Sequence, residues 1–439
     1  MGRATAELLT KSGKLIYAIG RLGSSSLLSL IDLATFWMYL DYFGLGGVLT
    51  GVAFAVGKLV IAFFGWYFGY LSDVTVSKRW GRRKPYILAG SLLLAFSTVM
   101  LFVPDYFIAI GNQSSLFLYA TFFLSLANLS YGLLSTPYTA WLAEIADPEE
   151  RVGVSAYQNV FGMMAQVVGT LISFSLPLLR AEGPTQILLL LLGLAVFEIL
   201  LYVPAIFKIR EKDRPIPKPN VRREIQKVLG NRNYQRWFVV QGLMSMPTAI
   251  LASLIMTYLQ KVLMVSGVEY MIVGGLMLLA TILLFPVWAM ISRRVGKKLP
   301  ISASLLILIL SLPLTMLIGQ PVLGFIPIIM QASLFIALIG VGLSGWYLLP
   351  NPVTADMAQE DEASGGEARA GSYAGLISIP LNVLQALARF IAGFIADLPL
   401  VAGQSYSMGL LVWGPVSSVL LVPCLLIIVK YVETDPLRK

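Results

Sequence analysis

About a dozen long apolar segments run through this chain, and they constrain its fold more than any other feature. Their approximate centres lie at residues 32, 60, 95, 126, 166, 196, 248, 278, 309, 335, 383 and 419. A helix needs ~20 apolar residues to cross the hydrocarbon core of a bilayer, and each segment is about that long. Of the 439 residues, 57% are hydrophobic and only 13% are charged, whereas soluble domains are roughly 25% charged. We therefore predict an all-α polytopic membrane protein with twelve transmembrane helices that contact the lipid bilayer.

Basic residues are concentrated in three of the connecting segments. These segments are residues 78–84, 208–236 and 293–298, whereas the opposite loops hold little beyond Arg180 and Lys261. Positive charge is retained on the cytoplasmic side of a membrane, so the pattern predicts that these loops and both termini are cytoplasmic and that the protein lies in the plasma membrane. The formal net charge of +9 then reflects topology and contact with anionic headgroups, and we expect no nucleic-acid partner. The N-terminal residues lack a signal-peptide pattern, so the first helix is expected to stay in the mature protein.

Histidine is absent from the sequence, and Cys424 is the single cysteine. Imidazole proton relays, Ser-His or Cys-His catalysis, disulfides within the chain and cysteine-based metal sites are therefore excluded. We expect neither an enzyme nor a cofactor or metal site.

The two halves of the chain repeat one another. Pro137 to Glu144 closes the fourth segment and leads through an acidic stretch to Arg151, and Pro350 to Asp356 closes the tenth and leads through another to Arg369. The polar, proline-containing stretch 208–236 lies between the halves. We predict a bundle of six helices over residues 1–207, a cytoplasmic linker over 208–236 with a short amphipathic helix at Val221–Leu229, and a second bundle over 237–439.

The loop after the second segment resembles the signature loop of major facilitator superfamily transporters. It reads Gly69-Tyr70-Leu71-Ser72-Asp73 and then Gly81-Arg82-Arg83-Lys84-Pro85. The proline, acidic stretch and arginine in each half, together with residues 42–45 and 369–373, resemble the glycoside–pentoside–hexuronide:cation symporters. The resemblance implies two pseudo-symmetric bundles that take up a sugar or glycoside by alternating access, with the substrate bound between them near the midplane.

Several binding residues of that family are replaced here. The two carboxylates that hold the coupling cation in the second helix fall on Ile61 and Gly65, and the sugar-binding aspartate before the helix-4 proline falls on Ser135. Lys58 matches the basic residue that precedes the cation-binding carboxylates. With that carboxylate pair missing, we expect a proton as the coupling ion and sodium as the less favoured alternative.

Four ionisable residues fall inside apolar segments: Asp32, Lys58, Glu198 and Arg389. Each costs at least ~2.5–3.5 kcal/mol to insert and so requires a reason. Asp32 and Lys58 lie on consecutive antiparallel helices, and we expect Asp32 to exchange the coupling proton while Lys58 sets its pKa; a static ion pair and no contact at all are the alternatives. Arg389 shares a helical face with Asn382 and Gln385, where it either binds substrate or closes an interhelical network. Glu198 is expected to be structural.

Uncharged polar and aromatic residues complete the candidate substrate site. They are Asn128, Ser135, Gln158, Asn159, Trp37 and Trp346. Amides and hydroxyls bind sugar hydroxyls and aromatic rings stack on sugar faces, although the same residue types also bridge helices or mark membrane interfaces.

Charged residues at the helix ends are predicted to form gating networks that hold one state of alternating access. They are Asp73, Arg82, Arg83, Glu144, Arg151, Asp356 and Arg369. We expect a monomer with a small-molecule substrate. An organic anion held by Lys58 and Arg389, or an amphiphile, is the first alternative substrate, and a membrane sensor that does not transport is the second alternative function.

Overall fold

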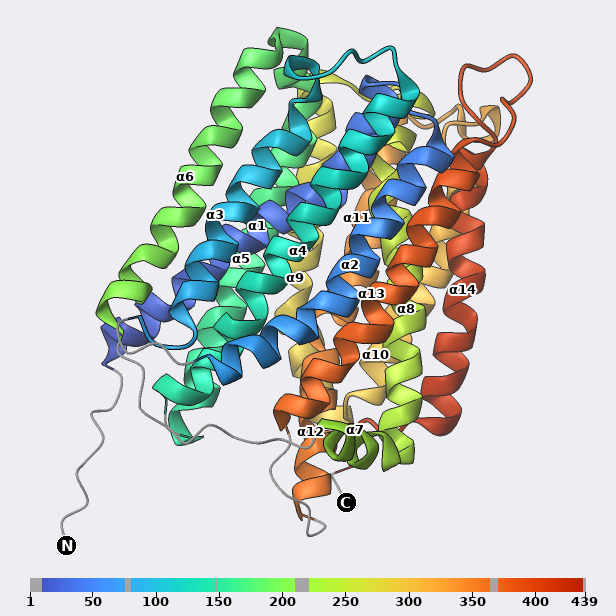
Figure 1. Ribbon diagram of the computed structural model, residues 1–439. Coiled ribbons are helices and arrows are strands. Elements are labelled where there is room, and N and C mark those ends of the chain that lie inside the picture. Colours follow the sequence, from blue (N-terminus) through green and yellow to red (C-terminus); the bar gives the residue numbers. More distant parts are fainter. Residues whose placement is uncertain (1–9, 76–79, 147, 210–220, 364–369, 437–439) are drawn as a thin grey trace, which may run out of the picture. The chain divides into compact units, whose positions relative to one another are not determined.

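The protein is described here by a computed structural model that covers residues 10–75, 80–146, 148–209, 221–363 and 370–436. These residues form α-helices joined by short turns (Figure 1). The first half of the chain comprises α1 (Lys11–Trp37), α2 (Gly47–Val74), α3 (Lys84–Phe102), α4 (Gln113–Ile145), α5 (Pro148–Glu182) and α6 (Pro184–Lys208). The second half comprises α7 (Val221–Gly230), α8 (Arg232–Lys261), α9 (Gly267–Val295), α10 (Lys298–Ser311), α11 (Ile328–Leu348), α12 (Pro350–Ala363), α13 (Ala370–Ala396) and α14 (Gly409–Tyr431).

Each predicted transmembrane segment corresponds to one long helix. Within the described ranges, eleven spans are long and apolar enough to cross a membrane. The first helix, α1, is 27 residues long but less apolar, because it carries Lys14, Arg21, Asp32 and a run of serines. Its polarity is the first indication that α1 turns a face toward something other than lipid.

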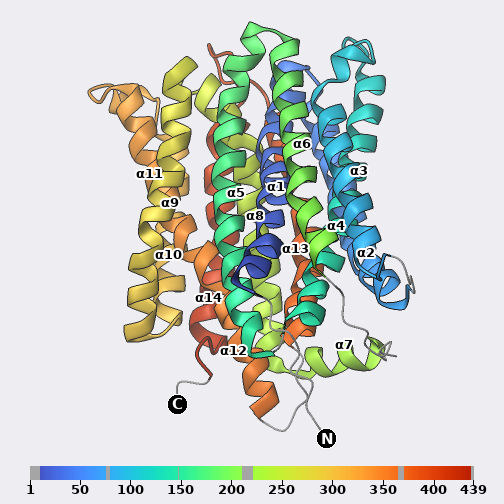
Figure 2. The same ribbon diagram turned by 90° about the vertical axis from the view of Figure 1, so that its left-hand side faces the viewer.

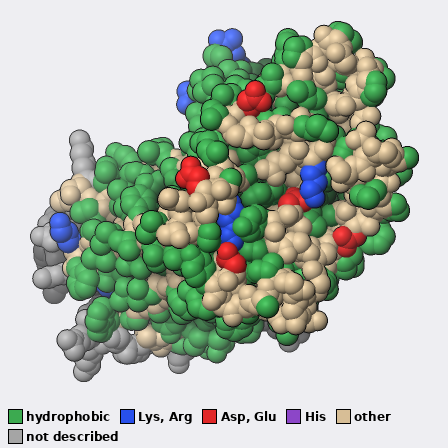
Figure 3. Space-filling model, turned by 90° about the horizontal axis from the view of Figure 1, so that it is seen from above, with side chains coloured by type: hydrophobic (Ala, Val, Ile, Leu, Met, Phe, Trp, Pro, Cys, Tyr) green, Lys and Arg blue, Asp and Glu red, His purple; other side chains and the backbone are tan. Residues whose placement is uncertain are grey.

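Large apolar side chains cover much of the outer surface. Phe63, Leu118, Phe207 and Phe325 are among the most exposed. At the end of the molecule seen in Figure 3, hydrophobic side chains are interspersed with other groups and a few charged side chains. Exposed apolar surface of this extent is unfavourable in water and favourable in lipid.

The chain divides into two compact units. The first comprises residues 1–38 and 56–218, and the second comprises residues 39–55 and 219–439. The tip of the first helical hairpin, residues 39–55, therefore packs with the second unit although its flanks belong to the first. The tip begins with a π-helical segment, Met38–Tyr42, which is a kind of irregularity that often occurs at functional sites.

In the first unit, α1 is the central helix. It packs along α5 and α6, and α3 packs along α4 and α6 (Figures 1 and 2). Two glycines of α1 allow this close approach: a Cβ on Gly20 would lie 2.6 Å from the Tyr202 ring, and one on Gly23 would lie 2.8 Å from the Glu198 backbone. Glu198 is completely buried and accepts a hydrogen bond from the Ser91 hydroxyl (2.8 Å).

In the second unit, α8 is the central helix and packs along α13 and α14, while α9 packs along α11. The predicted amphipathic helix is present as α7. Asn231 follows α7 and caps α8, where its side-chain oxygen accepts the backbone N–H groups of Asn233 and Tyr234.

The two basic loops turn in the same way. Gly81 has φ 77° and Gly296 has φ 87°, a conformation that favours glycine. The stretch Pro350–Asp356, predicted to close the tenth transmembrane helix, forms the first half of α12, and the acidic residues 360–362, predicted as a loop, are helical as well. Pro350 ends α11 but then serves as the first residue of α12, a position where its missing N–H costs nothing.

Candidate functional site

Asp32 and Lys58 form an ion pair between α1 and α2. The Lys58 Nζ lies 2.7 Å from the Asp32 Oδ1. Lys58 is 4% exposed, whereas the side chain of Asp32 is 29% exposed. The contact predicted from the sequence is therefore present, and the carboxylate is the member of the pair that a proton can reach.

Asn128 of α4 packs against α2 at Gly57. A Cβ on Gly57, the residue before Lys58, would be 3.1 Å from the Asn128 Nδ2. That Nδ2 donates to the Leu124 carbonyl oxygen (2.9 Å), whereas the buried Oδ1 accepts no hydrogen bond from the described residues. Asn128 therefore has a buried acceptor without a described partner where α4 packs on α2. Ser135 is half-buried and lies about two turns beyond Asn128 on α4. Asn159 of α5 is exposed.

Gln158 belongs to a polar aromatic cluster between α1, α4 and α5. Tyr17 and Tyr138 stack with ring centroids 4.7 Å apart, and the Tyr17 hydroxyl donates to the Tyr138 carbonyl oxygen (2.6 Å). The Gln158 amide lies beside the hydroxyls of both tyrosines, and its buried Nε2 donates to none of the described groups. Arg21, one turn beyond Tyr17 on α1, faces the same cluster; sequence reasoning did not single it out.

The predicted polar face of α13 is directed largely toward protein. Arg389 is 2% exposed, donates to the Ser253 hydroxyl (2.7 Å) and lies 4.8 Å from the centre of the Phe54 ring. The Asn382 Nδ2 donates to the Ser378 carbonyl oxygen of its own helix (2.8 Å). Gln385 is half-buried. These contacts match the interhelical network that was the alternative to substrate binding at Arg389.

The two tryptophans are buried in helix packing. Trp37 is 4% exposed and Trp346 is 7% exposed. The Trp346 ring lies 6.2 Å from that of Trp237, whose Nε1 donates to the Thr354 hydroxyl (2.9 Å). Trp346 thus contributes to the junction of α8, α11 and α12.

The sequence profile of the MFS/sugar transport protein family matches residues 16–432, which is nearly the whole chain. The chain belongs to this family. It is 29% identical over 234 residues to an uncharacterized symporter of Synechocystis, covering 51% of this chain and 42% of the relative. It is 26% identical over 178 residues to the isoprimeverose transporter of Lactiplantibacillus pentosus, covering 39% and 35%. The chain thus aligns with less than half the length of these curated relatives.

The fold is that of solved major facilitator transporters. The crystal structure of the nucleoside transporter NupG superposes with a TM-score of 0.63 at 15% identity, covering 95% of this chain and 99% of the other. A bacterial homologue of the human lysosomal transporter Spinster superposes with a TM-score of 0.61 at 13% identity, covering 95% of each chain. The twelve-helix major facilitator fold predicted from the sequence is confirmed.

In this MFS transporter, the predicted gating residue Asp73 forms an ion pair with Arg83. The Arg83 guanidinium is buried and also donates to the Ser72 hydroxyl, so one arginine links the end of α2 to the start of α3. Arg82 is half-buried beside it. The side chains of Glu144, Arg151 and Arg369 lie outside the described residues.

In the second unit, Asp356 pairs with Lys297, a residue that sequence reasoning missed. Lys297 also lies 3.3 Å from Asp435, whose Oδ2 accepts the Lys297 backbone N–H (2.8 Å). Burial alone raises the pKa of Asp435, but these bonds, the Thr434 hydroxyl and the nearby ammonium outweigh burial and lower the pKa below its usual value. The repeat between the two halves could have identified Lys297, because Lys297 follows Gly296 as Arg82 follows Gly81.

Two further polar contacts in the second unit hold the hairpin tip, and neither was predicted. Asp397, after α13, accepts the backbone N–H groups of Gly47 and Val48 at 2.7 Å each. Asp41 pairs with Lys261 (2.5 Å) and accepts a hydrogen bond from Thr257. Asp397 thus supplies an anion at the N-terminus of α2, where the helix dipole favours one.

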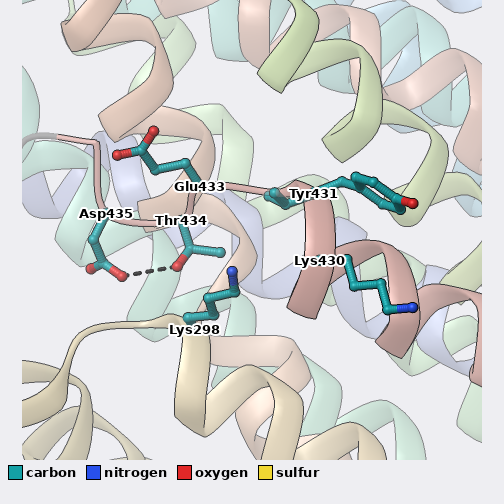
Figure 4. A pocket seen from close by; sticks show the side chains of 7 residues that line it. Lys298, Lys430, Tyr431, Glu433, Thr434 and Asp435 are labelled. Atoms are coloured by element: carbon teal, nitrogen blue, oxygen red, sulfur yellow. Dashed lines mark hydrogen bonds between the residues drawn. The ribbon is translucent and has the colours of Figure 1, made fainter.

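Figure 4 shows a shallow surface pocket of 310 Å³ where α14 ends. Lys298, Lys430, Glu433 and Asp435 are among the residues that line it. None of the predicted substrate residues lies there, and its mixed charges are those of a surface loop.

Proposed function

We propose that this MFS transporter is a proton-coupled symporter of a sugar or glycoside that works by alternating access. The observation that carries the proposal is the Asp32–Lys58 pair, in which a solvent-accessible carboxylate meets a buried ammonium at 2.7 Å. The positions that hold the cation-binding carboxylates of the second helix in the glycoside–pentoside–hexuronide:cation symporters are Ile61 and Gly65 here. Asp32 is then the carboxylate best placed to exchange a proton beside the helix-2 site.

The chemistry of the pair supports coupling. Protonating Asp32 removes the partner of a buried lysine, and leaving such a charge uncompensated costs ~3–5 kcal/mol. The protonated state therefore favours any rearrangement that brings a substrate hydroxyl, an amide such as Asn128 or water to the Lys58 ammonium. Because linkage is reciprocal, a substrate that binds the protonated state better also raises its affinity for the proton.

The pairs at the helix ends act as gates in this proposal. Asp73–Arg83 and Lys297–Asp356 are assigned to one end state of the cycle and are expected to break in the other. The positive charge of the basic loops supports a cytoplasmic position for these pairs and for both termini, in the plasma membrane. The transporter is proposed to work as a monomer.

The test follows proton entry into proteoliposomes loaded with a pH-sensitive dye. A panel of mono- and disaccharides is added with and without sodium, to the wild type and to Asp32→Asn. We expect at least one sugar to drive proton entry that ignores sodium and disappears in Asp32→Asn. Glu182→Gln, an exposed carboxylate at the end of α5, serves as the matched control and should transport normally.

Three outcomes count against the proposal. Sodium-dependent sugar uptake would mean that the cation site has been rebuilt elsewhere. Undiminished proton entry in Asp32→Asn, accompanied by lower thermal stability, would make the pair a static structural contact. No proton entry for any sugar, with folded protein, would refute sugar–proton symport.

A further inference from the structure

Arg21 is a cation inside the helical bundle of the first unit that forms no ion pair with any described carboxylate. It lies in α1 and is half-buried. Lys58, Arg83, Arg180, Lys261 and Lys297 each have an aspartate partner. A partly desolvated guanidinium is costly unless an anion compensates it.

The groups around Arg21 are neutral. Its electrostatic neighbours are four tyrosines: Tyr131 first, then Tyr202, Tyr138 and Tyr17. On the α5 side, a Cβ on Gly162 would lie 3.6 Å from the Arg21 Cγ and Nε, so this glycine leaves room for the arginine side chain. Phenol hydroxyls hydrogen-bond to a guanidinium or to an anion, but they do not neutralise positive charge.

Gln158 adds a second unused donor. It is 7% exposed, and its Nε2 donates to no described group, although buried amide N–H groups are nearly always bonded. The Gln158 amide lies against the hydroxyls of Tyr17 and Tyr138, the same tyrosines that surround Arg21. The cluster therefore offers a fixed cation with N–H and O–H donors, and no described carboxylate is among the electrostatic neighbours of Arg21.

Donors of this kind fit an anion better than they fit a neutral sugar. The N–H donors of a guanidinium match the planar oxygen pair of a carboxylate, and they donate equally well to the oxygens of a sulfonate. A neutral sugar needs acceptors as well as donors and would leave the arginine uncompensated.

We propose that the transported substrate carries a carboxylate or sulfonate that binds Arg21, with Gln158 and Tyr131 as the additional donors. This inference rests on the proposed transport function and narrows the substrate to an acidic sugar or hydroxylated organic acid. Lys58 and Arg389, the cations first considered for an anion, already have protein partners.

The proton site and the anion site are separate along one helix. Arg21 and Asp32 differ by 32 − 21 = 11 residues, which is close to three full turns, so both lie on one face of α1, roughly 16 Å apart. Symport of one anion with one proton moves no net charge. Acid-driven proton entry is therefore expected without an accompanying current.

The experiment measures binding to the purified full chain in detergent, by calorimetry, for matched acidic and neutral probes. The pairs are methyl glucuronide with methyl glucoside, methyl galacturonide with methyl galactoside, and glycerate or 2,3-dihydroxypropanesulfonate with glycerol. A charge-assisted hydrogen bond is worth roughly 10- to 150-fold in affinity. We expect at least one acid to bind at least ~10-fold more tightly than its neutral partner.

Two variants test the role of Arg21. Arg21→Gln should reduce the preference for the acid to less than ~3-fold, and Arg21→Lys should retain part of it, because Lys keeps the charge but lacks the planar fork. Gln158→Glu places a carboxylate beside Arg21 and should abolish the preference while the arginine remains. Arg293→Gln, an exposed cation in α9, is the matched control and should behave as the wild type.

The proposal is overturned if no acid binds better than its neutral partner, or if the preference survives in Arg21→Gln. Because binding is measured without a proton gradient, either result leaves proton coupling through Asp32 untouched. Conversely, failure of proton coupling in Asp32→Asn leaves a measured preference for the acid intact.

Discussion

Replacing Gly393 of α13 by alanine should loosen the hairpin tip. A Cβ at this position would lie 2.2 Å from the Gly47 carbonyl oxygen. Contacts under 3.0 Å do not occur for real Cβ atoms, so α2 must retreat by at least 3.0 − 2.2 = 0.8 Å. If α2 moved away from Asp397 along the direction of its 2.7 Å hydrogen bonds to Gly47 and Val48, these distances would lengthen to about 3.5 Å, beyond a normal hydrogen bond.

The energetic effect combines overpacking with weakened capping. Overpacking costs ~1–3 kcal/mol, which corresponds to roughly a 5- to 150-fold loss in the population with the tip attached. Thr50 is 1% exposed, so Thr50→Cys in a Cys424→Ala background reports detachment through its rate of maleimide labelling. We expect Gly393→Ala to raise that rate by a factor in this range.

Gly375→Ala in the same helix is the matched control. Gly375→Ala brings the same gain in helix propensity as Gly393→Ala, but a Cβ at position 375 meets nothing within 4 Å. Equal labelling rates in the two variants, with both proteins folded, would refute the reasoning that backbone contact between α2 and α13 holds the tip.

Three further predictions concern carboxylates. Asp397→Asn removes one charge-assisted bond and the charge at the start of α2, and should raise Thr50→Cys labelling roughly 5- to 30-fold. Asp73→Asn leaves the buried Arg83 without its carboxylate and should lower the free energy of unfolding by ~1–3 kcal/mol, measured by thermal unfolding in detergent. The lowered pKa of Asp435 means that its stabilising effect is present above the unfolded pKa of ~3.9 and is lost as pH falls through the folded value. The melting temperature between pH 5 and pH 3 should therefore fall less in Asp435→Asn than in the wild type; parallel curves would contradict this.

The sequence was sufficient for the features that depend on local pattern. Apolar length located the helices, and adjacency of two antiparallel helices was enough to bring Asp32 and Lys58 together. Contacts between distant segments were not accessible in this way. Asp397 meets Gly47 across 350 residues, and nothing in either local sequence specifies the partner.

Arg21 shows a different limit. Its position near the start of α1, close to Lys11 and Lys14, reads as part of a basic helix end. Only the packing of α1 on α5 shows that this arginine faces an interior cluster of tyrosines and that no described carboxylate pairs with it. The acidic residues 360–362 were predicted as a loop but belong to α12, because a proline can begin a new helix as readily as it ends one.

The hairpin tip has a consequence for the order in which the protein assembles. Residues 39–55 are synthesised more than two hundred residues before their partners Lys261, Arg389 and Asp397. Until those partners are made, the N-terminal turn of α2 lacks its cap and Asp41 lacks the Lys261 ammonium. This hairpin therefore precedes the helices on which its final contacts depend. If the chain were divided at the linker, the second unit would be incomplete until the first fragment supplied residues 39–55.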